Sequence, residues 1–238
     1  MIMTKAIIHR ASSRGVSNLS WMKSYHSFSY GQYFNPIRMQ FGKLRVLNDE
    51  RIQPNRGFSS TPLDNMEMVT IVLDGELKHT DTLGNDKILK RGGIQCLSGG
   101  SGVKHSELNN DAEADLRLLH MRFLPKDKGV APQYNSCSFD LDNQKSELVL
   151  LVGADQGLPI AQDACVSWGN MEKNAECDYK IHHSGNGLYL LVIEGMVHLE
   201  DHVAFPNDAI GVWTDEETVH LKMMADSKFI LIEMPPKR

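Results

Sequence analysis

The sequence is poor in the features that mark secreted, membrane-spanning and nucleic-acid-binding proteins. Its 238 residues include only four cysteines, and its 25 lysines and arginines are outnumbered by 30 acidic residues, which gives a net charge of −5. No apolar run approaches the ~18 residues that a transmembrane helix needs, and the apolar run at the N-terminus is too short for a signal peptide. The composition therefore predicts a cytoplasmic protein without direct nucleic acid binding and without membrane association.

The cysteines are too few and too far apart for a disulfide framework. They are Cys96, Cys137, Cys165 and Cys177, and no two have Cys-x-x-Cys spacing. In a cytoplasmic chain of this size, such residues are expected to be reduced, small and buried. The alternative is a redox-sensing thiol, which needs an exposed cysteine of low pKa. The sequence singles out none of the four for that role.

Short apolar runs, separated by glycine and proline, fill the chain, whereas helix-period patterns are sparse. The run Met68–Leu73 has the length of a buried strand, and Asp74-Gly75 directly after it is a strong hairpin signal. The hydrophobic content of 41% is enough for a substantial core. The pattern predicts an all-β protein.

An internal repeat indicates two barrels. The segment Val72–Leu77 is echoed by Val192–Val197, with an acidic-Gly turn between two apolar strands in each. We predict an N-terminal barrel in residues 1–125, a linker in 126–140 and a C-terminal barrel in 141–238. Closing sheets into barrels removes exposed strand edges.

The repeat also predicts which positions of the second half correspond to those of the first. At a constant offset of 120 residues, His105 and Glu107 correspond to Ala225 and Ser227. Neither of these is a good metal ligand, so the second half is expected to hold no ligand cluster of its own.

Three segments of the first half carry a specific pattern. They are Ser24-Tyr-His-Ser-Phe-Ser-Tyr-Gly-Gln-Tyr-Phe-Asn-Pro36, the motif Gly-Phe-x-x-x-Pro-x-x-x-Met-Glu that ends at Glu67, and Ser98-Gly-Gly-Ser-Gly-Val-Lys-His-Ser-Glu107. This pattern resembles the first barrel of the pirin family of bicupins, in the cupin superfamily. The resemblance covers most of residues 1–125 and implies two antiparallel, jelly-roll-like cupin barrels packed together.

The resemblance implies a metal site that this sequence has partly lost. Pirins typically hold one metal ion with three His and one Glu, and the matched positions here are Thr61, Leu63, His105 and Glu107. Leu cannot donate to a metal, and a neutral Thr hydroxyl is a poor ligand. We therefore expect no cofactor or, failing that, one divalent transition metal (Fe, Ni, Cu, Mn or Zn) at His105 and Glu107.

His120 would add a further ligand to the same site. It lies in the predicted strand Leu116–Leu124, where alternation places Leu116, Leu118, His120 and Arg122 on one face. If this face points into the barrel, His120, His105 and Glu107 form a set of two His and one carboxylate, a combination used by non-haem iron. The alternative is a core His that is hydrogen-bonded to a backbone carbonyl.

Three other residues are expected to line the first barrel together with Thr61 and Leu63: Phe58, Met66 and Glu67. Glu67 is expected to share the strand face of Leu63 and to make structural hydrogen bonds at the rim. His182 and His183 are adjacent, so on a strand they face opposite ways and cannot chelate one ion. We interpret this pair as a surface feature.

Two functions follow from the resemblance and from the two metal-ligand positions that this sequence lacks. The first is a pirin-like protein with a degenerate metal site, which binds a small apolar or aromatic ligand or a regulatory protein partner without efficient catalysis. The alternative is an enzyme similar to the quercetin 2,3-dioxygenases among the pirins, which cleave flavonols with dioxygen. In that reading Glu107 takes the substrate's hydroxyl proton as general base. The metal content of the purified protein distinguishes the two.

Overall fold

The structure, a computed structural model, describes residues 5–143, 147–153 and 156–237. In these ranges the chain forms β-strands and one short 3-10 helix, η1 (Ala11–Ser13), with no α-helix, so the predicted all-β fold is confirmed. None of the helical segments described there has the length and hydropathy of a membrane span. The chain divides into two compact units. We call Gly15–Leu141 with Leu158–Gln162 the first barrel, and Met1–Arg14, Asp142–Gly157 and Asp163–Arg238 the second barrel.

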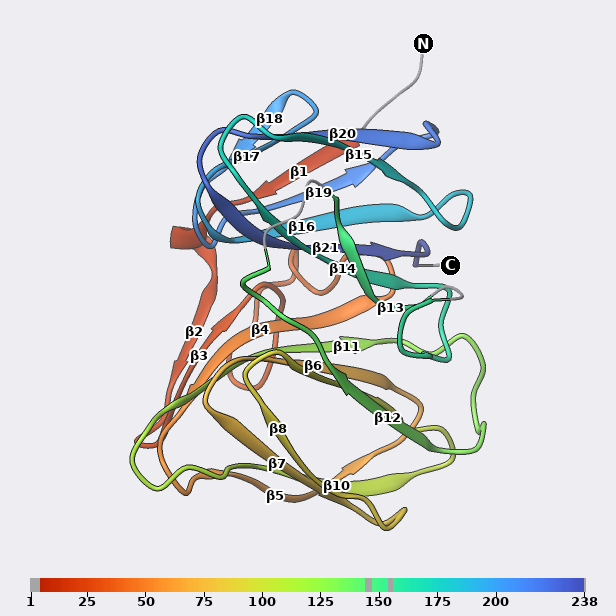
Figure 1. Ribbon diagram of the computed structural model, residues 1–238. Helices are drawn as coiled ribbons and strands as arrows, with labels where there is room; N and C mark the ends of the chain where they lie inside the picture. The colour runs from red at the N-terminus through yellow and green to blue at the C-terminus, as the bar shows by residue number, and fades with distance from the viewer. Residues whose placement is uncertain (1–4, 144–146, 154–155, 238) are drawn as a thin grey trace. The chain divides into compact units, whose positions relative to one another are not determined.

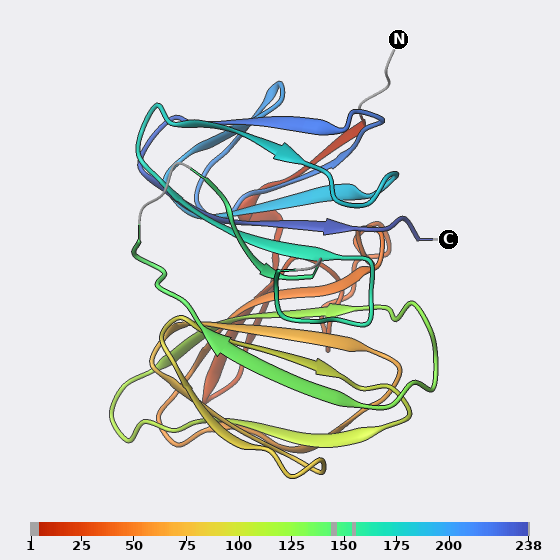
Figure 2. The same ribbon diagram turned by 45° about the vertical axis from the view of Figure 1, so that its right-hand side comes forward.

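The first barrel consists of two antiparallel sheets that face each other in both views of Figures 1 and 2. Its larger sheet has the strand order β12 (Gln133–Ser138), β9 (Gly93–Ser98), β6 (Glu67–Asp74), β11 (Leu116–Phe123), β4 (Leu44–Ile52), β3 (Met22–His26) and β2 (Gly15–Asn18). Its smaller sheet has the order β5 (Gly57–Leu63), β10 (Val103–Asn109), β7 (Glu76–Asp81) and β8 (Asp86–Lys90).

The second barrel repeats this arrangement with several shorter strands. Its larger sheet has the order β1 (Lys5–His9), β19 (Ala209–Trp213), β16 (Gly187–Glu194), β21 (Ser227–Met234), β14 (Cys165–Met171) and β13 (Val149–Val152). Its smaller sheet has the order β15 (Glu176–Lys180), β20 (Thr218–Met223), β17 (Val197–Leu199) and β18 (His202–Ala204).

Strand pairing divides the chain at other places than the predicted boundaries. β1 pairs with β19, so residues 5–14 belong to the second barrel and not to the predicted N-terminal barrel of 1–125. The predicted linker 126–140 contains β12, which pairs with β9 at the edge of the first barrel. The largely exposed side chains of β12 give it no apolar pattern, which is why the sequence indicated a loop there.

The acidic-Gly turns predicted from the repeat are present in both barrels. Gly75 joins β6 to β7 and Gly195 joins β16 to β17, with φ of 81° and 83°. A Cβ at Gly75 would lie 2.8 Å from the backbone oxygen of Asp115, and one at Gly195 would lie 2.1 Å from that of Asp226. Both turns therefore require glycine for its backbone conformation and for the close approach.

Past this turn the repeat does not keep its offset of 120 residues. Leu77 pairs with Asn109, and its counterpart Val197 pairs with Met223, so β20 takes the place of β10 at an offset of 114. His105 and Glu107 then correspond to Val219 and Leu221, not to Ala225 and Ser227. The shorter strands β17, β18 and β19, compared with β7, β8 and β9, account for the drift.

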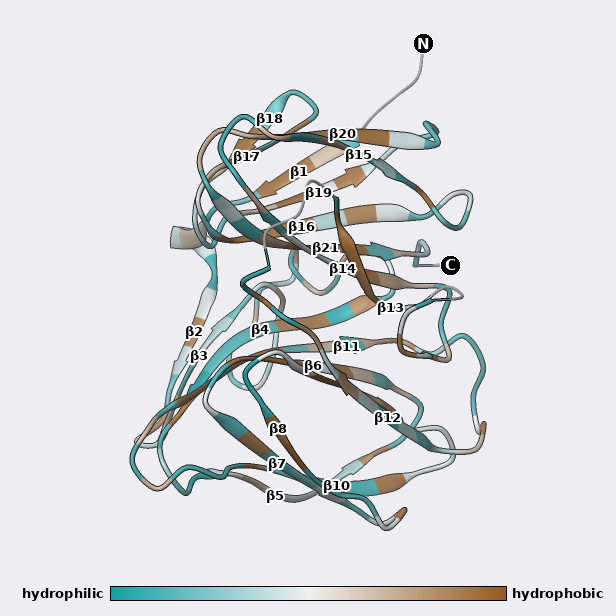
Figure 3. Ribbon diagram, viewed as in Figure 1, coloured by the Kyte–Doolittle hydropathy of each residue, from teal (hydrophilic) through white to brown (hydrophobic). Residues whose placement is uncertain are grey.

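Each barrel has an apolar interior, which appears as brown segments of strands such as β6 and β21 in Figure 3. The largest cluster of the second barrel includes Val219 and Leu221, the counterparts of His105 and Glu107. In the first barrel one cluster is formed by Met22, Ile52, Val72, Leu77, Leu89, Leu116 and Leu118. Leu116 and Leu118 thus face the interior, which shows that the strand face predicted to carry His120 points into the barrel.

The cysteines are not all buried. All four are free; Cys96 and Cys165 are buried as predicted, whereas Cys177 is half-buried and Cys137 is exposed. Cys137 lies on β12, the edge strand that the sequence did not reveal. Burial of its sulfur nevertheless raises the pKa of the Cys137 thiol, which is opposite to the low pKa of a redox sensor.

Candidate binding site in the first barrel

A row of polar side chains crosses the larger sheet of the first barrel. Register pairing runs from strand to strand through His26, Asn48, His120, Thr70 and Gln95. Paired residues of adjacent strands point to the same face of the sheet, so all five share the interior face. Each of them is at least 97% buried. A buried polar row of this kind is unusual in a β-barrel core and marks the region where chemistry or binding is to be sought.

Glu107 reaches this row from β10 in the smaller sheet. Its Oε1 accepts hydrogen bonds from Thr70 Oγ1 at 3.0 Å and from Gln95 Nε2 at 2.5 Å. The Gln95 amide is oriented by Tyr134, whose hydroxyl donates to Gln95 Oε1 across 3.1 Å. Burial alone would raise the pKa of Glu107, but the nearby imidazoles of His120, His105 and His79 and the bond from Thr70 outweigh it and lower the pKa. Glu107 is therefore a buried, ionised carboxylate.

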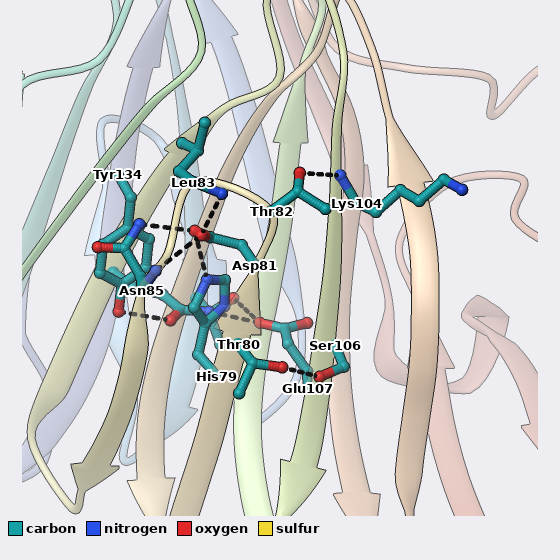
Figure 4. A network of polar contacts seen from close by, with 12 residues as sticks. His79, Thr80, Asp81, Thr82, Leu83, Asn85, Lys104, Ser106, Glu107 and Tyr134 are labelled. Atoms are coloured by element: carbon teal, nitrogen blue, oxygen red, sulfur yellow. Dashed lines mark hydrogen bonds and ion pairs between the residues drawn. The ribbon is translucent and has the colours of Figure 1, made fainter.

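His79 and Asp81 form a second buried pair on β7, seen in Figure 4. His79 Nε2 lies 3.1 Å from Asp81 Oδ2, and Asn85 Nδ2 donates to the same oxygen at 2.8 Å. Burial would raise the pKa of Asp81, but the hydrogen bonds from His79 and Asn85 outweigh it and lower the pKa. The His79 ring stacks on Tyr134 at a centroid distance of 4.5 Å. The ring is held rigidly, and its Nδ1 has no partner among the described residues.

The His105 side chain is buried on β10. It is 4% exposed, and its Nδ1 has no partner in the described ranges. Its ring lies nearly parallel to that of His79, with centroids 6.2 Å apart. Burial lowers the pKa of His105, so the ring is neutral near pH 7 and presents one N–H donor and one acceptor. An unsatisfied buried polar group costs about 1–3 kcal/mol, so these atoms are poised for a ligand or water.

His120 lies between a carboxyl group and a guanidinium. Arg122 Nε donates to His120 Nε2 at 3.3 Å, so the imidazole proton is on Nδ1, which lies 3.9 Å from Glu50 Oε2. Burial, reinforced by the Arg122 charge, lowers the pKa of His120 to about 3. We predicted that His120 shares the barrel interior with His105 and Glu107. Two observations support this: His120 belongs to the buried polar row of the larger sheet, and it contributes to lowering the pKa of Glu107. The alternative, a His bonded to a backbone carbonyl, does not describe these contacts.

Glu50 is a carboxyl group that the sequence did not single out. Its Oε1 accepts from Asn48 Nδ2 at 3.0 Å and from Ser24 Oγ at 3.3 Å, while its Oε2 has no hydrogen-bond partner in the described part of the chain. Burial raises the pKa of Glu50 to about 7. The first barrel therefore contains two carboxyl groups of different character, Glu107 with a lowered pKa and Glu50 with a raised one.

Thr61 and Leu63 have no role as donors to the barrel interior. Thr61 pairs in register with His105, but its hydroxyl donates to the Ser59 carbonyl at 2.8 Å. Leu63 is 3% exposed and belongs to an apolar cluster with Met68, Leu97 and Val103. The position that resembles a metal ligand in the sequence pattern thus forms part of an apolar wall.

The other predicted lining residues lie at the margins. Phe58 packs edge-on against Trp21 at 5.4 Å, and Met66 packs against the cluster of Leu63. Glu67 accepts hydrogen bonds from Ser98 Oγ and from the backbone N–H of Ala161. It does not share the strand face of Leu63, because a turn between β5 and β6 intervenes, with Asn65 at φ 47°. Its structural role agrees with the prediction, and Met68 is the residue that faces Leu63.

The donors of the first barrel do not form a compact metal site. Among the described residues, the one group of three His, Cys, Asp or Glu donors within 4.8 Å of one another is Cys165, His182 and Glu233, in the second barrel. In the first barrel Glu107 Oε1 is already bonded to Thr70 and Gln95. Since Thr61 and Leu63 supply no ligand, the residues present do not fit a site of three His and one Glu.

The cluster in the second barrel corrects the expectation that this half has none. Glu233 is fully buried and accepts from Tyr179 Oη and from the backbone N–H groups of His182 and His183, each at 2.9 Å. Burial would raise the pKa of Glu233, but these bonds outweigh it and lower the pKa. His182 is exposed, as predicted, yet its Nδ1 lies 3.0 Å from Glu233 Oε2. The carboxylate is thus occupied in anchoring the turn after β15.

The comparisons with known proteins cover both halves of the chain. Residues 8–121 match a family model described as Pirin, and residues 151–234 match one described as Quercetinase C-terminal cupin domain. A quercetin 2,3-dioxygenase of Escherichia coli is 30% identical over 96% of this chain and 98% of the relative. A pirin-like protein of Caulobacter vibrioides is 31% identical over 92% of this chain and 95% of its own length.

Solved structures agree with the sequence comparisons. The crystal structure of YhhW from Escherichia coli has a TM-score of 0.90 and 29% identity, and the match covers 98% of each chain. A structure of that bacterial pirin in complex with nickel(II) has a TM-score of 0.89 and 29% identity over 98% of this chain and all of the other. The predicted two-barrel cupin architecture is confirmed, and at least one relative binds a transition metal.

Proposed function

Because the chain belongs to the pirin family yet carries Thr61 and Leu63 where two metal-binding imidazoles were expected, we propose that its first barrel is a binding site rather than an efficient oxygenase centre. The ligand is a small molecule with an apolar or aromatic body, and the protein acts as a binding or regulatory module. A regulatory protein partner is part of the same proposal, as is a cytoplasmic location.

The observation that carries the proposal is the mixed lining of the barrel interior. Leu63, Met68, Leu97 and Val103 form an apolar wall. The buried Nδ1 atoms of His79 and His105 and the Oε2 atom of Glu50 have no hydrogen-bond partner within the described ranges. An apolar wall with a few convergent polar groups is the usual lining of a small-molecule site.

A metal-dependent, quercetin 2,3-dioxygenase-like activity is the second candidate. It is favoured by full-length relatives that bear this name and by the nickel complex of a 29% identical pirin. It is weakened by the donor geometry of the first barrel, where no three donors of the described residues converge within 4.8 Å.

Metal content and flavonol turnover separate the two candidates. We expect the protein purified without added metal to contain less than stoichiometric transition metal. We expect aerobic quercetin loss to be slow and unchanged by a chelator or by Glu107→Gln, because general-base help alone is worth only about 10²–10⁴-fold. One equivalent of metal together with fast, chelator-sensitive loss that Glu107→Gln abolishes would establish the enzyme.

A further inference from the structure

Three metal-ligating side chains converge at one end of the second barrel. Cys165 is the first residue of β14, and Glu233 lies near the end of the neighbouring strand β21 (Figure 1). The two residues pair in register, so their side chains share a face of the larger sheet. His182 joins them from the turn after β15. Its ring nitrogen, the Cys165 Sγ and a Glu233 carboxylate oxygen lie within 4.8 Å of one another.

The spacing of these atoms is close to that of ligands around one zinc ion. Zinc–ligand bonds of about 2.3 Å to sulfur and about 2.0–2.1 Å to nitrogen or oxygen place the ligand atoms of a tetrahedral ion about 3.3–3.6 Å apart. His182 Nδ1 already lies 3.0 Å from Glu233 Oε2. The Cys165 Sγ is at most 4.8 Å from its two partners, so a shift of about 1 Å closes the set around an ion.

Hydrogen bonds hold the Glu233 carboxylate in place. Its Oε1 accepts from the His183 backbone N–H and from Asn186 Nδ2, each at 2.9 Å, and its Oε2 accepts from the His182 backbone N–H at 2.9 Å. Carboxylates that bind metals are commonly fixed by such contacts, so anchoring the turn is compatible with holding an ion. The first barrel differs because its described residues lack a convergent donor set, not because its carboxylate is hydrogen-bonded.

The group is open to solvent on the side of His182. This side chain lines a cavity of about 420 Å³ together with Tyr179, and it lines a second cavity of about 500 Å³ together with Lys180. Cys165 and Glu233 are 0% exposed. An ion can therefore enter past the imidazole, and the exclusion of water around a thiolate and a carboxylate strengthens their attraction to it.

We propose that the second barrel binds one divalent transition-metal ion, with Zn²⁺ as the best match, through Cys165 Sγ, His182 Nδ1 and the Glu233 carboxylate. A set of thiolate, imidazole and carboxylate suits zinc and not magnesium or calcium. On binding, the thiol releases its proton to solvent and the imidazole carries its proton on Nε2. The site lies outside the first barrel, so it goes beyond the proposed ligand-binding function.

The ion is expected when metal is supplied and not after purification without it. The Tyr179 hydroxyl lies 2.9 Å from Glu233 Oε2 and 3.1 Å from His182 Nδ1. Coordination replaces the contact between His182 Nδ1 and Oε2 and competes with that hydroxyl, and both losses weaken the affinity. Low metal content of the purified protein is thus consistent with both this site and the proposed function of the first barrel.

Cobalt(II) in place of zinc(II) tests the site, because a thiolate bound to cobalt(II) gives a charge-transfer band in the near ultraviolet. Titrated into the reduced full chain without oxygen, cobalt(II) should produce this band up to one equivalent, and zinc(II) should remove it. An ion held by His105 and Glu107 has no sulfur among these ligands and gives no such band. Cys165→Ser should abolish the band, and His182→Gln should weaken cobalt(II) binding at least about tenfold.

The matched controls are Cys177→Ser and His183→Gln. Cys177 is a free thiol of the same barrel outside the group, and His183 contacts Glu233 through its backbone N–H. Both variants should keep the band and the affinity. Because Cys165 is buried, circular dichroism checks its variant, and the exposed His182 provides a test without a core substitution.

Three results would overturn the inference. They are absence of the band in the parent, a band that survives Cys165→Ser, and unchanged cobalt(II) affinity in His182→Gln. None of them bears on the ligand-binding function of the first barrel, which is tested separately by metal content and quercetin turnover.

Discussion

The side-chain amide of Gln95 donates to Glu107 Oε1 across 2.5 Å and so joins the two sheets of the first barrel. Gln95 lies on β9 of the larger sheet, and Glu107 lies on β10 of the smaller one. Because Tyr134 donates to the oxygen of the same amide, the orientation of Gln95 is fixed. The buried charge of Glu107 is thus stabilised by neutral donors that are held in place before any ligand arrives.

Gln95→Leu should destabilise the protein. The change keeps the approximate volume but leaves the buried Glu107 carboxylate with one donor fewer, at a cost of about 1–3 kcal/mol. Urea unfolding followed by circular dichroism measures this free energy. The control is Gln133→Leu, at an exposed position of the neighbouring β12, which should cost under about 0.5 kcal/mol. Equal losses in the two variants would mean that Glu107 does not depend on Gln95.

Stability should depend on pH through Glu50. Its folded-state pKa of about 7 lies above the ordinary value of 4.5, so the folded protein retains a proton that the unfolded chain releases. This contribution to stability is present below about pH 4.5 and is lost as the pH rises to about 7, with a total near 3 kcal/mol. The buried His120 acts in the opposite direction, because its lowered pKa costs stability as the pH falls below about 6.5.

Glu50→Gln isolates the carboxyl contribution, since His120 is present in both proteins. Between pH 5 and pH 8 the parent should lose stability relative to Glu50→Gln, measured by urea unfolding at each pH. Glu172→Gln, at an exposed position, should show the same change in unfolding free energy between pH 5 and pH 8 as the parent. Parallel pH profiles of the parent and Glu50→Gln would show that Glu50 titrates normally.

Restoring two imidazoles should create a metal site. Thr61 pairs with His105 and Leu63 with Val103, so Thr61→His and Leu63→His place both rings next to the strand of His105 and Glu107. We expect the double variant to bind nickel(II) at least about tenfold more tightly than the parent in a calorimetric titration. The control places the same two imidazoles at the exposed Ser60 and Asp64. If the control gains as much affinity, the first barrel contributes nothing beyond the added rings.

Gly195→Ala should cost more stability than Gly185→Ala. Both glycines have φ of 83°, so both variants carry the same conformational strain of about 1 kcal/mol. A Cβ at Gly185 would meet nothing within 4 Å, whereas one at Gly195 would lie 2.1 Å from the Asp226 backbone oxygen. The difference between the two unfolding free energies therefore measures the close approach at the turn. Equal costs would assign the whole effect to φ.

The sequence predicted strand faces and turns correctly where a local pattern of residues corresponds to a general rule of protein structure. Two-residue alternation placed Leu116, Leu118, His120 and Arg122 on one face, and the acidic-Gly turns identified the β6–β7 and β16–β17 hairpins. Such patterns depend on neighbouring residues only, so they can be recognised without knowing the fold.

The remaining site residues come from strands far apart in the sequence. The register of β4 and β9 brings Glu50 and Gln95 to the interior. No sequence motif next to either residue indicates this position. His79 and Asp81 carry an i, i+2 signal of the same kind as His105 and Glu107, and this signal could have identified them. The drift of the repeat offset from 120 to 114 depends on the lengths of β17, β18 and β19, which the repeat pattern at the turn does not report.

The apolar counterparts of His105 and Glu107 imply that the two halves of this chain tolerate change differently. In the second barrel Val219 and Leu221 pack into a continuous hydrophobic cluster, so an exchange among Val, Ile and Leu there keeps volume and chemistry nearly constant. In the first barrel Glu107 accepts hydrogen bonds from Thr70 and Gln95, so we expect few single exchanges in this network to be neutral. A mutational library should therefore accept conservative hydrophobic exchanges at 219 and 221 while accepting almost none at 107, and the halves should diverge at different rates from the common repeat.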